Sequence, residues 1–252
     1  MNSEGLISLE DLKNSIRPET VLVSIHFVNN EIGVVQPVEE IGQLCREKGV
    51  LFHTDACQAA GYFELDMKKL PVDLLTFNAS KIYGPKGVGV LYARDGVKIS
   101  PLLHGGGQEF KMRSGTENVA GIVGMGKAVE LIMEPPSPLA RGRIEVLRNE
   151  LWNLLQKEIS GVKLNGSWEK RSPNNLNVSF PGVDGDMLMR KLDLAGIAVS
   201  TTSACSSGMS EPSHVLKALG GGVERSSIRI SLGKYTTKKE IVELVKILKE
   251  IL

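Results

Sequence analysis

Lys81 stands where a lysine could act as a nucleophile. It follows a strand-like apolar run at residues 72–77 and precedes a glycine-proline turn and a second such run at residues 88–93. Burial at the end of a strand disfavours the charged form of a lysine, and the neutral amine can then form a Schiff base with a carbonyl group. The alternative is a surface lysine whose stem lies along the protein while its amine stays in water.

Asp55 ends the strand-like run at residues 50–55, and Gln58 follows that run. A carboxylate near a Schiff-base lysine could keep a pyridoxal ring nitrogen protonated. Gln58, one helical turn later, could hydrogen-bond the phenolic oxygen of the ring. The alternative for Asp55 is an N-cap for residues 56–61, and the two roles are compatible.

Asn29, Asn30, Asp55 and Lys81 all lie just beyond the ends of expected strands. In parallel sheets the groups beyond the carboxyl ends of the strands converge on one crevice, where ligands bind. This coincidence favours the Schiff-base interpretation of Lys81.

Cys205 and Arg229 are further candidates in the second half of the chain. Cys205 lies in a loop of small polar residues at 203–208, where a nucleophilic thiol would be accessible. An incidental loop cysteine is the alternative. Arg229 lies between two isoleucines on a short strand, so its guanidinium could meet a substrate carboxylate or an internal Asp or Glu.

Two glycine-rich segments, residues 105–107 and 114–116, could present backbone N–H groups and the hydroxyl of Thr116 to an anion. A plain turn would explain them as well. The turn at residues 84–87 is not a Walker loop, because GxxxxGK[ST] is absent.

The composition excludes several classes of protein. The 252 residues are 42% hydrophobic and 23% charged, with a net charge of +1, which gives no basis for a nucleic-acid or membrane surface. We find neither an apolar run of about 18 residues nor a secretory signal, so we expect a cytoplasmic protein. Three scattered cysteines and four scattered histidines favour neither disulfides nor a metal site.

Strands are expected at residues 21–27, 50–55, 72–77 and 88–93, with helices at 5–16 and 38–48. This order predicts an α/β fold with a largely parallel sheet. The run at 21–27 is nearly all apolar, which is typical of a strand covered on both faces. A long helix after residue 116 should end at the proline cluster 135–138, which we take as the domain boundary.

The remaining chain predicts a small α+β domain. Helices are expected around residues 144–155 and at 186–194, and strands at 162–164, 176–180, 197–200 and 227–231. Thr237 and Glu240 form a capping box for a final helix that reaches residue 252. We therefore expect two domains, residues 1–134 and 139–252.

Several long motifs follow one another over nearly the whole chain: VNNEIGVVQP (28–37), HTDACQAAG (53–61), KIYGPKGVG (81–89), HGGGQE (104–109), MRSGT (112–116), SACSSGMSEPSHVLKALG (203–220) and SSIRISLG (226–233). Together they resemble the cysteine desulfurase family, within the class V group of pyridoxal-phosphate enzymes. The resemblance implies the C-terminal part of a fold type I large domain, with a mostly parallel sheet, plus a small α+β domain.

The resemblance also implies roles for single residues. Lys81 would bind pyridoxal 5'-phosphate covalently and move protons, Asp55 would pair with the ring nitrogen, and Gln58 with the phenolate oxygen. Asn30 would contact cofactor or substrate, and Thr116 would reach the phosphate across a homodimer interface. Arg229 would hold the carboxylate of L-cysteine. Cys205 would take the sulfur as a persulfide, leave L-alanine, and pass the sulfur to an acceptor or iron–sulfur scaffold protein.

The sequence departs from the family pattern in three places. Asn78 and Ser80 stand where the family usually has serine and histidine, so hydrogen-bonding groups remain on the cofactor's phosphate side but the imidazole is gone. The family also begins well upstream of Met1, so the chain resembles one without its N-terminal portion, which carries a phosphate loop and a ring-stacking aromatic residue. Alternatives are a selenocysteine lyase-type enzyme and a non-catalytic assembly partner of a full-length homologue.

Overall fold

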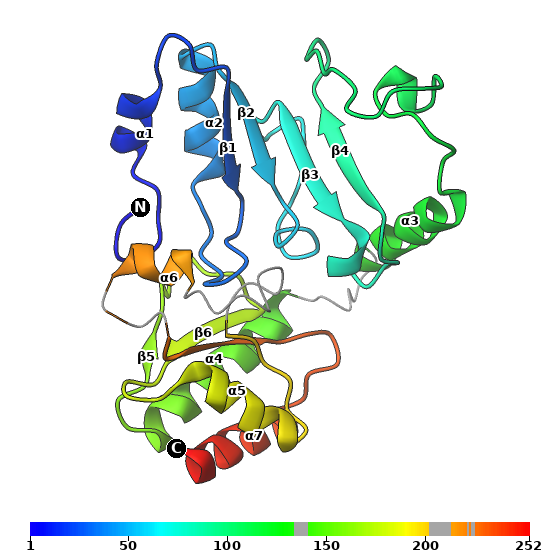
Figure 1. Ribbon diagram of the computed structural model, residues 1–252. Helices are drawn as coiled ribbons and strands as arrows, with labels where there is room; N and C mark the ends of the chain where they lie inside the picture. Colours follow the sequence, from blue (N-terminus) through cyan, green and yellow to red (C-terminus); the bar gives the residue numbers. More distant parts are fainter. Residues whose placement is uncertain (134–140, 202–212, 221, 223–224) are drawn as a thin grey trace. The chain divides into compact units, whose positions relative to one another are not determined.

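The structure is a computed structural model that describes residues 1–133, 141–201, 213–220, 222 and 225–252 (Figure 1). Its contacts divide the chain into two compact units. Unit 1 consists of Met1–Ser15, Phe27–Pro37 and Pro138–Leu252, and unit 2 consists of Ile16–His26 and Val38–Ser137. In the described part of the chain, no helix has both the length and the apolar character needed to cross a membrane.

Unit 2 is built on a four-stranded sheet in the order β1 (Leu22–His26), β2 (Leu51–Asp55), β3 (Leu74–Asn78) and β4 (Gly89–Ala93). The first three strands are parallel and β4 is antiparallel to β3, as the hairpin-length connection requires. The remaining elements of unit 2 are α2 (Val38–Glu47), the 3-10 turns η1 (Ala79–Lys81) and η2 (Glu109–Lys111), and α3 (Val119–Met133).

The helix α2 packs through the apolar stripe that the sequence predicted. Val38, Ile41 and Cys45 are buried on it, and Cys45 is a core residue as expected. Gly42 lies on the same face, where a Cβ atom would come within 2.3 Å of the carbonyl oxygen of Pro71. Only glycine allows this close approach between the helix and the segment that leads into β3.

One expectation for β1 is wrong. We predicted a strand covered on both faces, yet Leu22, Ser24 and His26 are exposed and only Val23 is buried. The strand lies at an edge of the sheet, next to β2 alone. Within unit 2, one face of β1 is therefore open to solvent.

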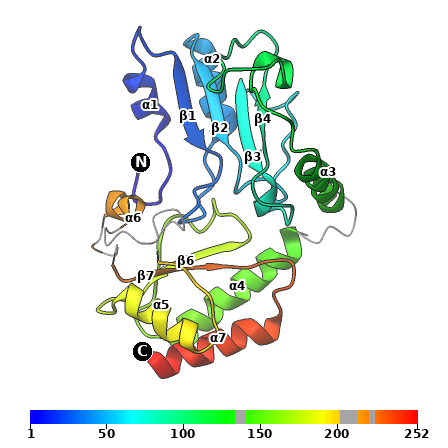
Figure 2. The same cartoon turned by 45° about the vertical axis from the view of Figure 1, so that its right-hand side comes forward.

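Unit 1 holds a three-stranded antiparallel sheet in the order β5 (Lys163–Leu164), β6 (Asn175–Ser179) and β7 (Ser227–Ser231). The helices α4 (Arg141–Glu158), α5 (Gly185–Leu194) and α7 (Lys238–Ile251) lie along this sheet (Figure 2). The short helices α1 (Leu9–Ser15) and α6 (His214–Leu219) complete the unit. Leu151, Leu176, Leu192 and Leu248 are fully buried and make its apolar interior.

The elements of unit 1 follow the predicted order with three differences. The first helix is shorter than expected, and α6 was not predicted. No strand forms at 197–200, where Gly196 turns the chain and only Ser200 bridges to Arg229. The capping box is confirmed, since the side chains of Thr237 and Glu240 each bond the other's backbone N–H.

The compact units differ from the predicted domains over the first 37 residues. Met1–Ser15 and Phe27–Pro37 group with the second half of the chain rather than with the four-stranded sheet. The proline cluster that marked the expected boundary lies outside the described residues. The division into domains 1–134 and 139–252 stays a prediction.

A buried carboxylate joins three segments of unit 2 and gives a first test. Asp73 is 2% exposed, and it accepts hydrogen bonds from the Phe52 N–H at 2.8 Å and from Nε of Arg94 at 2.7 Å. Replacing Arg94 by Ala leaves this charge without its cation. We expect Arg94→Ala to lower the free energy of unfolding by about 2 kcal/mol, measured by urea denaturation. The exposed Lys98→Ala is the control, and equal losses in both variants would contradict this role of Asp73.

Candidate active site

Asp55 ends strand β2, and its carboxylate is held from two sides. Oδ1 accepts the backbone N–H of Cys57 at 2.8 Å, and Oδ2 lies 3.8 Å from Nε2 of His26. His26 and Asp55 are directly paired residues at the ends of the parallel strands β1 and β2. The hydrogen bond from the Cys57 N–H stabilises a turn and does not cap a helix, because residues 57–60 form a turn. The carboxylate is about one-third exposed, so it remains accessible to a ligand.

Lys81 follows the next strand, β3, in the 3-10 turn η1. The prediction that it is buried is wrong, because its side chain is exposed. The turn buries Ala79 and Ile82, and Ile82 packs against Ala60 and Ala128 in the core. Because these two residues point inwards, the side chain of Lys81 points towards solvent. Burial therefore does not make this amine nucleophilic within unit 2. Its position beside the Asp55 turn does agree with a shared site, since both residues act electrostatically on Cys57.

Asn78 and Ser80 belong to a hydrogen-bonded chain beside Asp55. The hydroxyl of Ser80 donates to Oδ1 of Asn78 at 2.9 Å, and Nδ2 of Asn78 donates to Sγ of Cys57 at 3.3 Å. Burial raises the pKa of the Cys57 thiol to about 12, and the hydrogen bond and negative charge of Asp55 add to the effect. Asp55 thus disfavours the thiolate form of Cys57. Gln58 is half-buried on the same turn.

Thr116 lies in the glycine-rich loop of unit 2 and is exposed. The loop closes on itself, since the Ser114 hydroxyl donates to the Gly106 carbonyl at 2.7 Å and the Gly115 N–H donates to Oε1 of Gln108 at 3.2 Å. Gly115 has a φ of +111°, a backbone conformation that disfavours other residues. An anion site at Thr116 stays a prediction.

Asn30 and Arg229 meet within unit 1. Nη1 of Arg229 donates to the carbonyl oxygen of Asn30 at 3.0 Å, and β7 holds Arg229 half-buried. The side chain of Asn29 accepts the N–H groups of Glu31 and Ile32, which bends the loop that carries Asn30. The structure thus couples the predicted carboxylate-binding arginine to the predicted cofactor-contacting asparagine.

Buried polar groups fix the Asn30 loop. Arg171 is 4% exposed and donates to the Ile32 carbonyl at 2.7 Å, and Asn175 and Asn177 donate to the Glu31 carbonyl. Burial, together with the charge of Arg148, lowers the pKa of Arg171 to about 9. The Glu31 carboxylate accepts the hydroxyl of Ser213, which caps α6. Because backbone carbonyls carry these bonds, the loop cannot shift without leaving buried donors unsatisfied.

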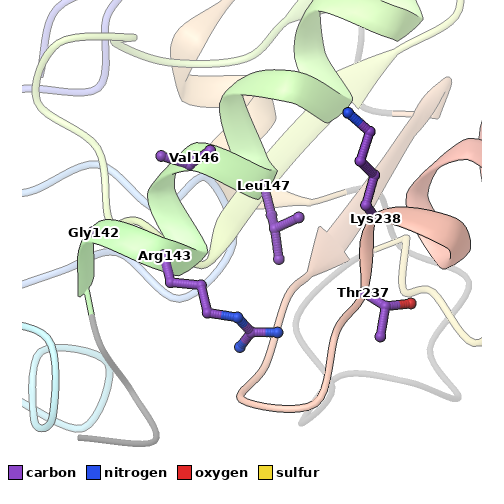
Figure 3. A pocket seen from close by; sticks show the side chains of 6 residues that line it. All are labelled: Gly142, Arg143, Val146, Leu147, Thr237 and Lys238. Atoms are coloured by element: carbon purple, nitrogen blue, oxygen red, sulfur yellow. The ribbon is translucent and has the colours of Figure 1, made fainter. Parts of the chain in front are cut away.

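Cys205 lies outside the described residues, so its predicted role stays a prediction. The hollow that the structure shows in unit 1 (Figure 3) has a volume of about 520 Å³ and involves none of the predicted site residues. It lies at the start of α4 and α7 and is lined by Gly142, Arg143, Val146, Leu147, Thr237 and Lys238. The guanidinium of Arg143, which lines this hollow, donates hydrogen bonds to the carbonyls of Lys234 and Thr236.

Sequence reasoning missed three residues beside the candidate site. His26 ends its strand as Asp55 does, and that shared position was a usable signal. Cys57 was interpreted as a turn cysteine whose thiolate Asp55 disfavours, and its hydrogen bond from Asn78 was not predicted. Arg171 carried no signal, because its partners are backbone carbonyls, which any residue type supplies, and one of them, that of Ile32, is far away in the sequence.

Comparisons with known proteins agree with this arrangement. The model of the family described as aminotransferase class-V matches residues 1–244. The protein named cysteine desulfurase IscS from Clostridium botulinum (strain Hall) is 48% identical over 256 residues, which cover all of this chain and 64% of that protein. The protein of the same name from Dictyoglomus turgidum is 47% identical over 255 residues, again 64% of its length.

Solved structures give the same result. A NifS-like protein superposes with a TM-score of 0.89 at 40% identity, covering all of this chain and 66% of that one. A structure described as SspA in complex with cysteine has a TM-score of 0.76 at 35% identity, covering 94% and 65%.

The chain belongs to the aminotransferase class-V family. The predicted fold class, an α/β large-domain part with a mostly parallel sheet plus a small α+β domain, is thereby confirmed. The relatives that it resembles are cysteine desulfurases, and it spans 64% of the length of the first two.

His53 links Ser24 on β1 to Thr76 on β3 through side-chain hydrogen bonds, and its titration gives a test of this arrangement. Its ring nitrogens bond Ser24 Oγ at 2.8 Å and Thr76 Oγ1 at 3.2 Å. Burial lowers the pKa of His53; Asp55 opposes this and His26 adds to it. Because His53 binds a proton more readily in the unfolded chain than in the folded one, protonation of His53 lowers the free energy of unfolding as the pH falls below about 6.5.

We therefore expect the free energy of unfolding to decrease less in His53→Gln than in the wild type when the pH is lowered from 7.5 to 5. Urea denaturation at both pH values measures this difference. His104→Gln, in an exposed loop, should behave like the wild type. The same pH dependence in His53→Gln and wild type would contradict the assignment.

Proposed function

We propose that this chain is the cofactor- and cysteine-binding part of a cysteine desulfurase. The observation that carries the proposal is the placement of Asp55 and Lys81 just past the carboxyl ends of the neighbouring parallel strands β2 and β3. A carboxylate and an amine in this arrangement suit pyridoxal chemistry, in which one group pairs with a ring nitrogen and the other with a carbonyl carbon. The similarity to relatives named cysteine desulfurase supports the choice of reaction.

The donor set around Asp55 fits pyridoxal 5'-phosphate. The Asp55 carboxylate is partly exposed and accepts bonds, Lys81 is exposed, and Gln58 lies on the intervening turn. On the phosphate side, Ser80 and Thr116 offer exposed hydroxyls, while Asn78 is engaged with Cys57 and Ser80. We propose these residues as the cofactor's ligands. When bound, the cofactor supplies an electron-withdrawing ring that stabilises negative charge at the substrate α-carbon.

The chain's own residues would perform the remaining steps. Arg229, held by the Asn30 carbonyl, would bind the carboxylate of L-cysteine through a charge-assisted pair. Lys81 would bind the cofactor, release it to the substrate, and then carry a proton from and to the substrate carbon. The Cys205 thiolate would attack the substrate sulfur; the carbon–sulfur bond breaks, a persulfide forms on Cys205, and the carbon takes a proton to leave as L-alanine.

We propose that full activity needs groups from the third of the relatives that this chain does not match. The open face of β1 supports this, because Leu22, Ser24 and His26 are exposed on it and His26 lies beside the Asp55 carboxylate. An edge strand with an exposed face can pair with or be covered by another segment. The same surface supports the second candidate, a non-catalytic partner that assembles with a longer homologue.

We propose a homodimer, a cytoplasmic location, and a sulfur-accepting or iron–sulfur scaffold protein as partner. For the homodimer, the supporting observation is the apolar side of α3 and of the glycine-rich loop. Its exposed residues include Val119, Val123, Met133, Leu102 and Phe110. Exposed apolar residues on these segments support association with another chain.

The cofactor proposal is tested by adding pyridoxal 5'-phosphate to the purified chain. We expect a visible absorption band from the Lys81 adduct, which borohydride reduction makes permanent and peptide mass spectrometry locates. Lys81→Ala should abolish the band. Lys86→Ala, an exposed lysine on the following turn, should keep it.

A chain that gives no band, alone or with the unmatched part of a relative added, would contradict the enzyme proposal and favour the assembly partner. A reduced adduct on Lys86 instead of Lys81 would contradict the assignment of the lysine.

A further inference from the structure

We propose that Cys57 is a positioning residue for Asp55: its sulfur accepts a hydrogen bond from Asn78 while its backbone N–H donates to the carboxylate, and the two bonds together fix how that carboxylate faces the cofactor. The inference rests on the proposed function for its consequence, but its geometry stands on this chain alone. It also assigns a role to the two positions that depart from the family pattern.

The hydrogen bonds run in one direction from η1 to β2. Ser80 Oγ donates to Asn78 Oδ1 at 2.9 Å, and Asn78 Nδ2 donates to Cys57 Sγ at 3.3 Å. The backbone N–H of Cys57 donates to Asp55 Oδ1 at 2.8 Å. Cys57 thus accepts a hydrogen bond at its sulfur from the β3 side and donates one from its backbone to Asp55.

The surroundings of Cys57 favour the protonated thiol. Burial and Asp55 raise the pKa of the thiol to about 12, while the Asn78 N–H and the Lys81 charge oppose the change. A thiol in this state is a poor nucleophile. Cys57 therefore serves to hold the Asp55 turn and is no second sulfur acceptor beside Cys205.

The other oxygen of Asp55 faces a different group. Oδ2 lies 3.8 Å from Nε2 of His26, whose strand β1 flanks β2. Asp55 thus lies between Cys57 on its own turn and His26 on the neighbouring strand. The hydrogen bond from the Cys57 N–H restrains one oxygen of the carboxylate, and such restraint favours a fixed geometry for pairing with a ring nitrogen.

The same contacts explain Asn78 and Ser80. A serine at position 78 is too short to bridge to Sγ and to Ser80 as the asparagine amide does. The amide has both a donor and an acceptor, and it uses both here. Asn78 thereby contributes to the cofactor site through Cys57 and Asp55.

The first experiment needs no cofactor. The rate at which iodoacetamide alkylates Cys57 is followed against pH by peptide mass spectrometry, in a Cys205→Ser background. We expect Asp55→Asn to lower the apparent pKa of Cys57 and thereby to speed its alkylation at pH 9 about tenfold, because the thiolate fraction rises. Asn78→Ala should raise the apparent pKa, because sulfur loses a donor. Glu64→Gln, an exposed carboxylate in the same unit, is the control.

The second experiment measures the affinity for pyridoxal 5'-phosphate by visible absorbance. We expect Cys57→Ala to weaken binding about tenfold, the effect of one lost positioning bond, and Cys57→Ser to restore most of it. Wild-type affinity in Cys57→Ala, or alkylation rates unchanged in Asp55→Asn, would overturn the positioning role. If no variant binds cofactor, the proposed function fails, and the alkylation profile alone decides whether the hydrogen-bond chain exists.

Discussion

The parallel pairing of β1, β2 and β3 is the constraint on which the site in unit 2 depends. Its register sets His26 opposite Asp55 and Asp55 opposite Thr76. Three chain segments thereby bring their polar ends to one edge of the sheet, and Lys81 follows directly from the third strand. The same pairing holds the Asp55 turn in place, because the Ala56 N–H donates to the Thr76 carbonyl at 2.8 Å. Without this register, His26 would not lie beside the carboxylate.

In unit 1, the corresponding constraint is a set of hydrogen bonds that restrains an irregular loop. The segment that carries Asn30 has no long strand of its own, so its carbonyls are bonded by Arg171, Asn175, Asn177 and Arg229. Arg171 remains buried through backbone dipoles rather than a carboxylate, which explains why burial lowers its pKa. A predicted substrate-binding group and a predicted cofactor-contacting group are thus parts of one rigid network.

Much of this could be predicted from the sequence, and the failures have physical causes. Apolar periodicity predicted α2 and the inward side of its stripe, and the pairing of Thr237 with Glu240 predicted the start of α7, because both signals are local. The exposure of Lys81 could not be predicted, since it depends on which residues of a three-residue turn fill the core. The apolar run of β1 was misleading because its composition does not report which neighbours cover it. Residues 197–200 have the composition of a strand but form only one bridge.

In the function that we propose, sulfur leaves L-cysteine through Cys205 on this chain, assisted by the site around Asp55 and Lys81. The most direct measurement is peptide mass spectrometry of Cys205, together with assay of L-alanine, after L-cysteine and pyridoxal 5'-phosphate are added. The chain would be measured alone and mixed with the unmatched part of the Clostridium botulinum relative. We predict a persulfide on Cys205 with matching L-alanine in the mixture, and neither in Cys205→Ser. L-Alanine formed at the same rate by Cys205→Ser, or no persulfide under any condition, would contradict the proposal.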